Sequence, residues 1–162
     1  MHQTHVSTHG GITVISSEIE IKARKNKVWE VLRDIGGIAQ FHPLVKASKT
    51  LSHTASGLGA RRYCALLPMG SMEEEVIAWH EGQSFVMEVV GGQLLPPHKF
   101  MKGHIELSDN YDSTKVRFSF SYQLKYGVLG RWMNALLIQP QFKKAPPQYV
   151  QGLKAYVENT AH

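Results

Sequence analysis

ITVISSEIEIKARKNKVWEVLRDIGG, residues 12–37, combines a strand pattern with a helix pattern. Alternating apolar and charged residues predict a strand over Ile12–Lys22. Apolar residues then recur at helical spacing from Val28 to Ile35. Asn26 can cap this helix, and Gly36-Gly37 ends it. The chain therefore begins with one strand and one amphipathic helix, before any other strand is available to pair.

A second short helical turn is expected over Ile38–Phe41, and the hydrophobic period then changes from 3.6 residues to 2. Six strand-like runs follow: Leu44–Leu51, Ala60–Leu67, Met72–Trp79, Ser84–Val90, Lys99–Leu107 and Lys115–Tyr126. The last run alternates most cleanly, as half-buried antiparallel strands do. With the first strand, this order predicts a curved antiparallel sheet of seven strands that wraps around a helix, a fold of the α+β class.

The C-terminal tail carries the helix that such a sheet would hold. Apolar residues recur at helical spacing from Trp132 to Leu137. Pro140 should break a continuous helix, because it lacks an amide donor and clashes one turn back. Pro146-Pro147 suits the first turn of a second segment. We therefore expect two helical pieces rather than one rod.

Length and composition place limits on function. The 162 residues suit a single domain over 12–160, preceded by a flexible arm over 1–11. The basic residues that give the net charge of +5 are scattered, so no nucleic-acid surface is indicated. No apolar run reaches the roughly 18 residues of a membrane span, and the N-terminus has no apolar signal core. We expect a cytoplasmic protein without integral membrane association.

No cofactor, metal or nucleophile motif stands out. Cys64 is the only cysteine, and the histidines that follow the N-terminal arm, His42, His53, His80, His98 and His104, include no pair at the i, i+4 spacing of a helical metal site. Phosphate-cradling loops and nucleophile elbows are absent from the sequence. His98 and His104 could act as acid–base groups near a pocket mouth, but exposed surface histidines are the simpler interpretation.

Five short motifs, spread from the first helix to the tail, together resemble the START-like (SRPBCC) superfamily. They are Val28-Trp29-Glu30-Val31-Leu32-Arg33-Asp34 with Phe41-His42-Pro43, Gly57-Leu58-Gly59-Ala60-Arg61-Arg62, Glu75-Val76-Ile77-Ala78-Trp79, Val89-Val90-Gly91-Gly92 and Gln151-Gly152-Leu153-Lys154-Ala155-Tyr156-Val157. This superfamily includes polyketide cyclase/dehydrase-like proteins, pollen-allergen-like proteins and plant abscisic-acid receptors. The resemblance implies a helix-grip fold, with two short helices after the first strand and a seven-stranded sheet around a C-terminal helix.

The resemblance to abscisic-acid receptors is closest at three places. Lys46 falls where those receptors keep a lysine that pairs with the ligand's carboxylate. Leu66–Gly70 and Gly91–Leu95 fall where they have a mobile gate and a latch. Only the Leu-Pro of the gate motif survives here, and the latch's His-Arg-Leu is absent. The resemblance thus implies a gated pocket, with lids over Leu66–Ser71 and Gly91–His98, but no hormone sensing.

Several polar and apolar side chains are candidates to contact a ligand in such a pocket. Lys46 is the first polar candidate, with an exposed lysine as the alternative. Glu75 is expected to point inward and to accept a ligand hydroxyl or pair with Arg62, with a solvated edge as the alternative. The candidate walls are Trp79, Phe85, Met87, Val89, Phe100, Phe118, Phe120, Tyr122, Trp132 and Phe142, each of which could instead be plain core.

The sequence therefore predicts binding of a small hydrophobic or amphipathic molecule, such as a lipid, a polyketide or a hormone-like compound, between sheet and C-terminal helix. Apolar walls would supply most of the affinity. The alternative is a polyketide cyclase, aromatase or dehydratase that works without a cofactor. A lipid chaperone or adaptor is a third class, and a homodimer stays open.

Overall fold

The computed structural model describes residues 2–160, so Met1 of the predicted arm lies outside the described residues. The sheet consists of β1 (Gln3–His9), β2 (Ile12–Ile21), β3 (Val45–Thr50), β4 (Arg61–Leu66), β5 (Ser71–His80), β6 (Ser84–Gln93), β7 (His98–Asn110) and β8 (Ser113–Leu124). The helices are α1 (Lys25–Arg33), the 3-10 helix η1 (Ile35–Gln40), α2 (Gly127–Met133), the π-helix η2 (Asn134–Ile138), α3 (Gln139–Phe142) and α4 (Ala145–Thr160).

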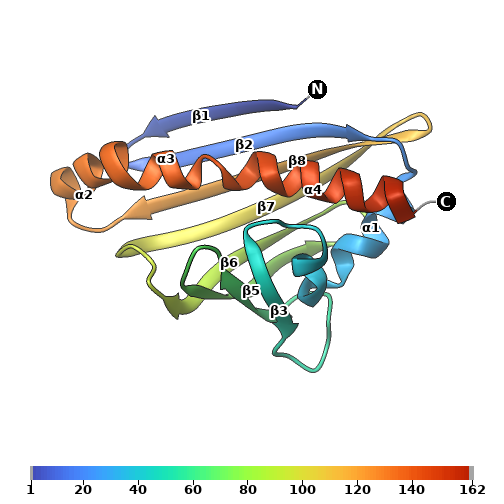
Figure 1. Cartoon of the computed structure of the whole chain (residues 1–162), viewed down its shortest axis with the longest axis horizontal. Helices are drawn as coiled ribbons and strands as arrows, with labels where there is room; N and C mark the ends of the chain where they lie inside the picture. Colours follow the sequence, from blue (N-terminus) through green and yellow to red (C-terminus); the bar gives the residue numbers. More distant parts are fainter. Residues whose placement is uncertain (1, 161–162) are drawn as a thin grey trace.

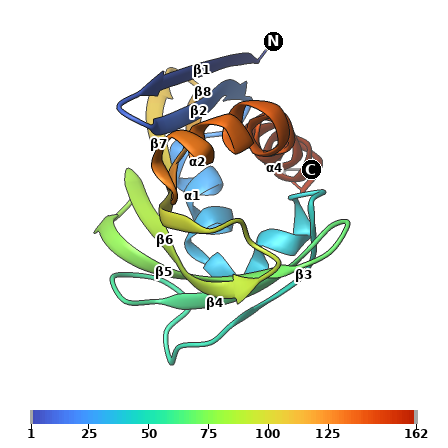
Figure 2. The same cartoon turned by 90° about the vertical axis from the view of Figure 1, so that its left-hand side faces the viewer.

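All eight strands form one antiparallel sheet in the order β1-β2-β8-β7-β6-β5-β4-β3. The sheet curves around the C-terminal helical segment, which lies across β2 and β8 (Figures 1 and 2). The 3-10 helix η1 lies against β3 and β4 at the other edge, and α1 contacts β7 and β8. This is the predicted helix-grip architecture of the α+β class. It has one strand more than predicted.

The additional strand is β1, in the segment that we expected to be a loose arm. The whole of β1, residues 3–9, pairs with β2, from Gln3 opposite Glu18 to His9 opposite Ile12. The turn between the two strands is Gly10-Gly11, and both glycines have positive φ angles, of 57° and 81°. Two consecutive left-handed residues suit a tight hairpin, and glycine adopts that conformation without strain. The polar sequence hid this strand, because an edge strand needs no apolar face.

The C-terminal segment is divided into two pieces, as predicted, but the division does not fall at Pro140. A π-helical turn over Asn134–Ile138 precedes this proline, and its wider backbone accommodates the missing amide donor. The helix then continues to Phe142 and turns at Lys143-Lys144 before α4 begins.

The two pieces bury very different amounts of apolar surface. In α4, Tyr149, Val150, Leu153 and Val157 are each at most 3% exposed, and they belong to the larger core cluster. In α2 and η2, only Gly130 and Asn134 are buried. The molecule is therefore closed beneath α4 and open beneath α2.

Candidate functional site

Strand register brings four connections together at the open end of the molecule. Ile12 lies opposite Gln123, His98 opposite Leu124, and Ser71 opposite Gln93. The β1–β2 hairpin, the β4–β5 turn, the β6–β7 loop and the β8–α2 connection therefore lie at the same end, on the left of Figure 1. The β4–β5 and β6–β7 connections include the predicted lids.

A pocket of about 520 Å³ opens at this end, between the β1–β2 hairpin, the ends of β7 and β8, and the segment from α2 to α3. Its lining residues are Thr8, Gly10, Gly11, Lys99, Tyr122, Gln123, Leu124, Gly127, Gly130, Arg131, Asn134, Ala135 and Gln139. The volume is within the range of small-molecule sites. Lys99 and Arg131 give the pocket a basic rim.

A hydrogen-bonded chain joins the pocket wall to the sheet. The hydroxyl of Tyr122 donates to Asn134 Oδ1 at 2.6 Å, and Asn134 Nδ2 donates to Thr13 Oγ1 at 3.0 Å. Burial raises the pKa of Tyr122, although the hydrogen bonds to Thr13 and Asn134 act in the other direction. The phenol therefore stays protonated at neutral pH. Asn134 is the first residue of the π-helix, so this wider turn points a polar group at the sheet.

Apolar side chains surround Tyr122 on the inner side of the pocket. Phe142 packs edge-on against both Tyr122 and Phe120, with ring centroids 5.0 and 5.3 Å apart. Phe120, Phe142 and Val89 remain partly exposed, although they belong to a core cluster that also contains the buried Ile15 and Met101. Phe120 and Phe142 contact Tyr122, but of these predicted wall residues only Tyr122 lines the pocket.

Deeper under η1 lies a buried ion pair that was predicted with a different partner. Arg62 Nε lies 2.6 Å from Glu74 Oε2, and Arg62 Nη1 donates to the carbonyl of Ile35 at 3.1 Å. Burial alone would lower the pKa of Arg62, but the carboxylate of Glu74 outweighs it and raises that pKa. Both charges are satisfied by each other, so this pair is part of the interior structure and is not free for a ligand.

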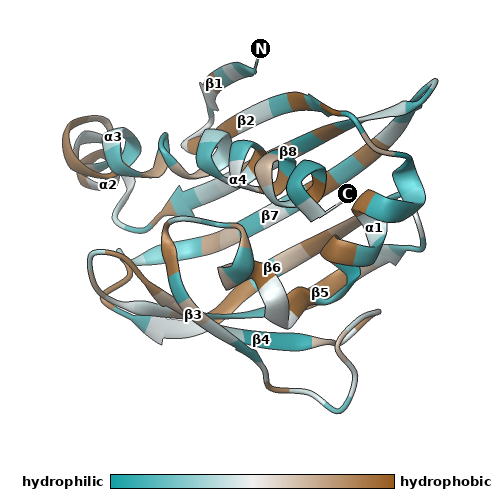
Figure 3. Ribbon diagram, turned by 45° about the vertical axis from the view of Figure 1, so that its right-hand side comes forward, coloured by the Kyte–Doolittle hydropathy of each residue, from teal (hydrophilic) through white to brown (hydrophobic). Residues whose placement is uncertain are grey.

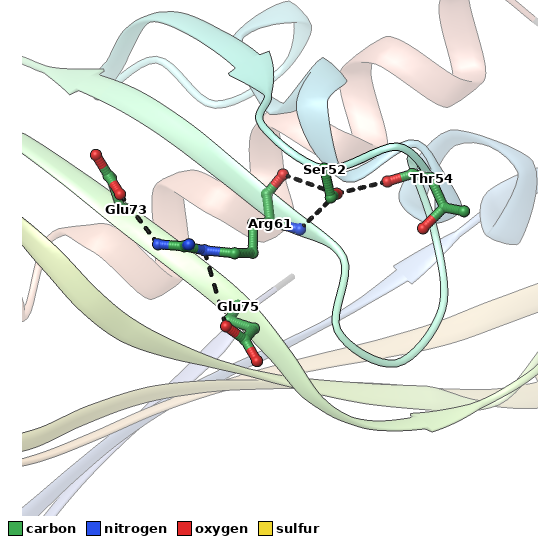
Figure 4. Close-up of polar contacts among 5 residues, drawn as sticks. All are labelled: Ser52, Thr54, Arg61, Glu73 and Glu75. Carbon is green, nitrogen blue, oxygen red and sulfur yellow. Dashed lines mark hydrogen bonds and ion pairs between the residues drawn. The ribbon is translucent and has the colours of Figure 1, made fainter.

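We expected Glu75 to be the inward-facing glutamate that pairs with Arg62, and that expectation is wrong. Glu75 lies opposite Arg61, and its carboxylate is 3.7 Å from Arg61 Nε, while Glu73 approaches Arg61 at 3.2 Å (Figure 4). The irregularity between Val76 and Ala78 adds one residue, Ile77, to β5 against β6, and Glu74 and Val76 are buried on the strand before it. Of the three consecutive glutamates, it is Glu74 that is buried.

Lys46 also differs from expectation. It is exposed on the edge strand β3 and is not among the residues that line the pocket. The strand has a bulge between Val45 and Ala47, which interrupts the alternation of inward and outward side chains at this lysine. The expectation of a buried lysine is therefore wrong, and its contact with a ligand carboxylate has no support in this arrangement.

The other predicted wall residues divide between core, outer face and rim. Met87 and Phe85 are 1% exposed core residues, and Trp79 stacks on Phe85 while its Nε1 donates to Glu81. Phe118 stacks on Tyr149 at 4.3 Å, beneath α4. Phe100 pairs with Gln123 and lies beside Lys102, on the face opposite to Met101. Trp132 is 64% exposed, at the rim of the open end.

The two histidines considered as acid–base groups lie outside the pocket lining. His98 Nδ1 is 2.8 Å from the carbonyl oxygen of Pro96. His104 alternates with the buried Gly103 and Ile105 and approaches Glu106, which places it on the outer face. No group of three metal-ligating side chains was found among residues 2–160. None of the helices described there is long and apolar enough to cross a membrane.

The sequence interpretation missed Asn134, Arg131 and Lys99 as pocket residues. Asn134 gave a usable signal, because it is a polar residue directly inside an apolar helical run, and buried polar residues need partners. Arg131 and Lys99 gave none, since exposed basic residues are common on any surface.

Comparison with known proteins agrees with this architecture. The family model described as "Polyketide cyclase / dehydrase and lipid transport" matches residues 13–158, and the chain belongs to that family. No match was found among curated proteins.

Solved structures with the same fold come from distant sequences. A START superfamily protein from Mycobacterium smegmatis is 14% identical, with a TM-score of 0.68, 91% of this chain covered and 98% of that one. Major latex-like protein 151 from Panax ginseng is also 14% identical, with a TM-score of 0.72 and the same coverage. Norcoclaurine synthase from Thalictrum flavum is 15% identical, with a TM-score of 0.70, 99% of this chain covered and 100% of that one.

Proposed function

We propose that the protein binds a small amphipathic molecule, such as a lipid or a polyketide, at the open end, in the space between the sheet and the C-terminal helical segment. The observation that carries this proposal is the pocket of about 520 Å³ beside partly exposed Phe120 and Phe142. A ligand would place its apolar part against Tyr122 and Leu124, behind which Phe120 and Phe142 pack, and its polar end near Arg131 and Lys99. Family membership supports the same class of ligand, because the family description includes lipid transport.

An acidic amphipathic ligand fits this arrangement better than a neutral one. The basic rim faces solvent, where an anionic group can keep part of its hydration and still pair with a guanidinium. The buried Tyr122 hydroxyl and Asn134 are already bonded to each other and to Thr13. Selectivity for a charged end should therefore arise at the rim, and affinity should arise from the apolar wall.

Filling the pocket tests the proposal. Ala135 lines the pocket on an exposed face of η2, so Ala135→Trp places a large ring there without disturbing the core. We expect this variant to bind a dansylated fatty acid about ten-fold more weakly than the unchanged protein, measured by fluorescence titration. Native mass spectrometry of freshly purified protein should show a bound small molecule that Ala135→Trp loses.

The matched control is Ala155→Trp, which adds the same ring to an exposed position of α4 away from the pocket lining. This variant should bind the probe like the unchanged protein. If Ala135→Trp and the unchanged protein bind the dansylated fatty acid equally well, the ligand site is elsewhere.

The alternative is a cyclase or dehydratase that acts on a similar ligand without a cofactor. The observation that favours it is a phenol in the pocket lining, Tyr122, whose hydroxyl is the kind of group that can hydrogen-bond a substrate oxygen. Product formation from a polyketide-like substrate that is lost in Tyr122→Phe, while probe binding persists, would favour the enzyme. Binding without turnover would favour the carrier. The cytoplasm remains the expected location for either function.

A further inference from the structure

The open end of the molecule carries an unusual amount of exposed apolar surface. Its exposed apolar and aromatic residues are Leu67, Met69, Leu94, Tyr126, Val128, Leu129, Trp132, Leu136 and Leu137. We define these residues as the apolar rim. Soluble proteins rarely leave so many large apolar side chains together in water, and such patches mark contact surfaces.

Most of the apolar rim belongs to one helical stretch. Trp132 follows Leu129 by three residues and Leu136 follows Trp132 by four, so the three side chains share one face of the segment α2–η2. They are 64 to 66% exposed. Figure 3 shows the apolar colouring gathered on α2, at the end opposite to the C-terminus. This face points away from the sheet, so the fold of the protein alone does not explain its composition.

The two predicted lids complete the apolar rim. Met69 and Leu94 are 67% and 74% exposed, and a Cβ atom at Gly70 would lie 3.3 Å from the Cβ of Leu94, so the two loops touch. Leu94 and Tyr126 both have left-handed backbone conformations, with φ angles of 59° and 73°. Left-handed conformations are unfavourable for residues with large side chains, and the side chains of Leu94 and Tyr126 are not buried against the rest of the protein to compensate.

Charge is distributed in a way that selects an anionic partner. Between Ser113 and Val157 the sequence contains no Asp or Glu, whereas its basic residues are Lys115, Arg117, Lys125, Arg131, Lys143, Lys144 and Lys154. Lys99, Lys125, Arg131, Lys143 and Lys144 are exposed near the apolar rim, and none of them forms an ion pair with another residue of the described range 2–160.

Acidic residues gather toward the opposite end. Glu81 lies in the β5–β6 turn, Asp109 and Asp112 lie at the β7–β8 turn, and Glu158 lies near the end of α4. Four glutamates lie away from that end. Glu73, Glu74 and Glu75 on β5 are each paired with Arg61 or Arg62, and Glu88 on β6 lies opposite Glu75. The open end therefore combines apolar side chains with unpaired positive charge.

We infer that the apolar rim docks on an anionic lipid membrane, with Trp132, Leu129 and Leu136 in the headgroup region and the neighbouring lysines and Arg131 against the lipid headgroups. Exposed apolar side chains flanked by basic ones are what a membrane-surface segment requires, since burial and electrostatic attraction then add. Tryptophan and tyrosine prefer this interface because they have an apolar body and a polar edge. The inference does not depend on the ligand proposed above.

Vesicle sedimentation tests the inference directly. The protein should bind vesicles of phosphatidylcholine with added phosphatidylserine, bind pure phosphatidylcholine vesicles about ten-fold more weakly, and lose binding as salt is raised. Leu136→Asp should weaken binding to the mixed vesicles about ten-fold or more, because it places a carboxylate in the contact. The matched control is Leu58→Asp, which changes an equally exposed leucine in the β3–β4 connection at the other end.

A second pair of variants tests the charge contribution. Lys143→Glu combined with Lys144→Glu should remove the preference for phosphatidylserine, whereas Lys27→Glu on α1 should not. Trp132 provides a direct depth reading, because it is 64% exposed while Trp29 is 5% exposed. Brominated lipid should quench the fluorescence of the unchanged protein, and Trp132→Phe should lose that quenching.

Three results would overturn the inference. Equal binding to both vesicle types would show that the basic residues do not select an anionic membrane. Binding that Leu136→Asp leaves unchanged would show that the apolar rim is not the contact. Self-association without lipid, measured by light scattering and abolished by Leu136→Asp, would show that the surface instead joins two copies of this chain. The ligand proposal is judged separately, because Ala135→Trp should lose the fatty-acid probe and still bind mixed vesicles.

Discussion

His42 is the buried residue that responds most directly to pH. Its side chain is 7% exposed, and its ring packs edge-on against Tyr149 at 5.5 Å. Burial and, to a smaller extent, the charge of Arg62 together lower the pKa of His42 to about 4. The imidazole therefore stays neutral in the folded protein at a pH where it would be charged in the unfolded chain.

This difference predicts a loss of stability in mild acid. Between pH 6.5 and 4 the unfolded chain binds a proton that the folded protein excludes, so the free energy of unfolding falls as pH falls. The loss amounts to at most about 3 kcal/mol, from a pKa difference of roughly two units and a half. Urea unfolding at pH 7, 5.5 and 4.5 should show it, and His42→Asn should flatten the dependence. An unchanged slope in that variant would assign the effect to other groups.

At the scale of elements, Gly152 determines how closely α4 approaches the loop after η1. A Cβ at this position would overlap the carbonyl oxygen of Phe41 and lie 3.3 Å from Pro43 Cδ. Alanine is normally the better helix residue by roughly 1 kcal/mol. Here we expect the opposite sign: Gly152→Ala should lower the free energy of unfolding by about 1–3 kcal/mol, because helix and loop must separate.

Ala155 offers the comparison on the same helix. Ala155→Gly changes an exposed position of α4 and should cost only the intrinsic helix preference, roughly 1 kcal/mol. Denaturant unfolding of both variants distinguishes the two effects. A stabilising Gly152→Ala would mean that α4 does not sit tightly against Phe41.

At the scale of the whole molecule, the closed and open ends have different local stability. Beneath α4, buried residues of β2, β8 and the helix form one apolar cluster, whereas α2 and η2 bury only Gly130 and Asn134. We expect amide hydrogens of β8 and α4 to exchange only on global unfolding, and those of α2 to exchange about a hundred-fold faster or more. Protection of α2 equal to that of α4 would contradict this division. Vesicles should slow exchange in α2 and η2 and leave exchange in α4 unchanged.

Much of the fold could be predicted because its signals are local. The alternation in β8 and the helical stripes in α1 and α4 each depend on residues close together in sequence, and burial on one face enforces them. The strand β1 escaped prediction because its partner β2, rather than any apolar face of its own, holds it in place. The helix break that we predicted at Pro140 does not occur there, because a π-helical turn before this proline accommodates its missing amide donor.

The candidate site depended on features that sequence patterns do not record. One-residue irregularities at Lys46 in β3 and at Ile77 in β5 interrupt the alternation of inward and outward side chains near Lys46 and Glu75, and a sequence pattern does not record them. Phe120, Tyr122 and Phe142 were identified as wall residues from their type alone. They lie near Asn134 and Arg131 only because the segment from α2 to α3 folds back over β8, and no local pattern shows that.

The sequence by itself determined the class of the fold, seven of its eight strands and the apolar character of its interior, because period and composition act between near neighbours. Only the tertiary structure decided which charges are buried, where the pocket opens and which apolar side chains face water. Those properties depend on register and on contacts between segments more than a hundred residues apart, such as Asn134 with Thr13. No local pattern contains that information.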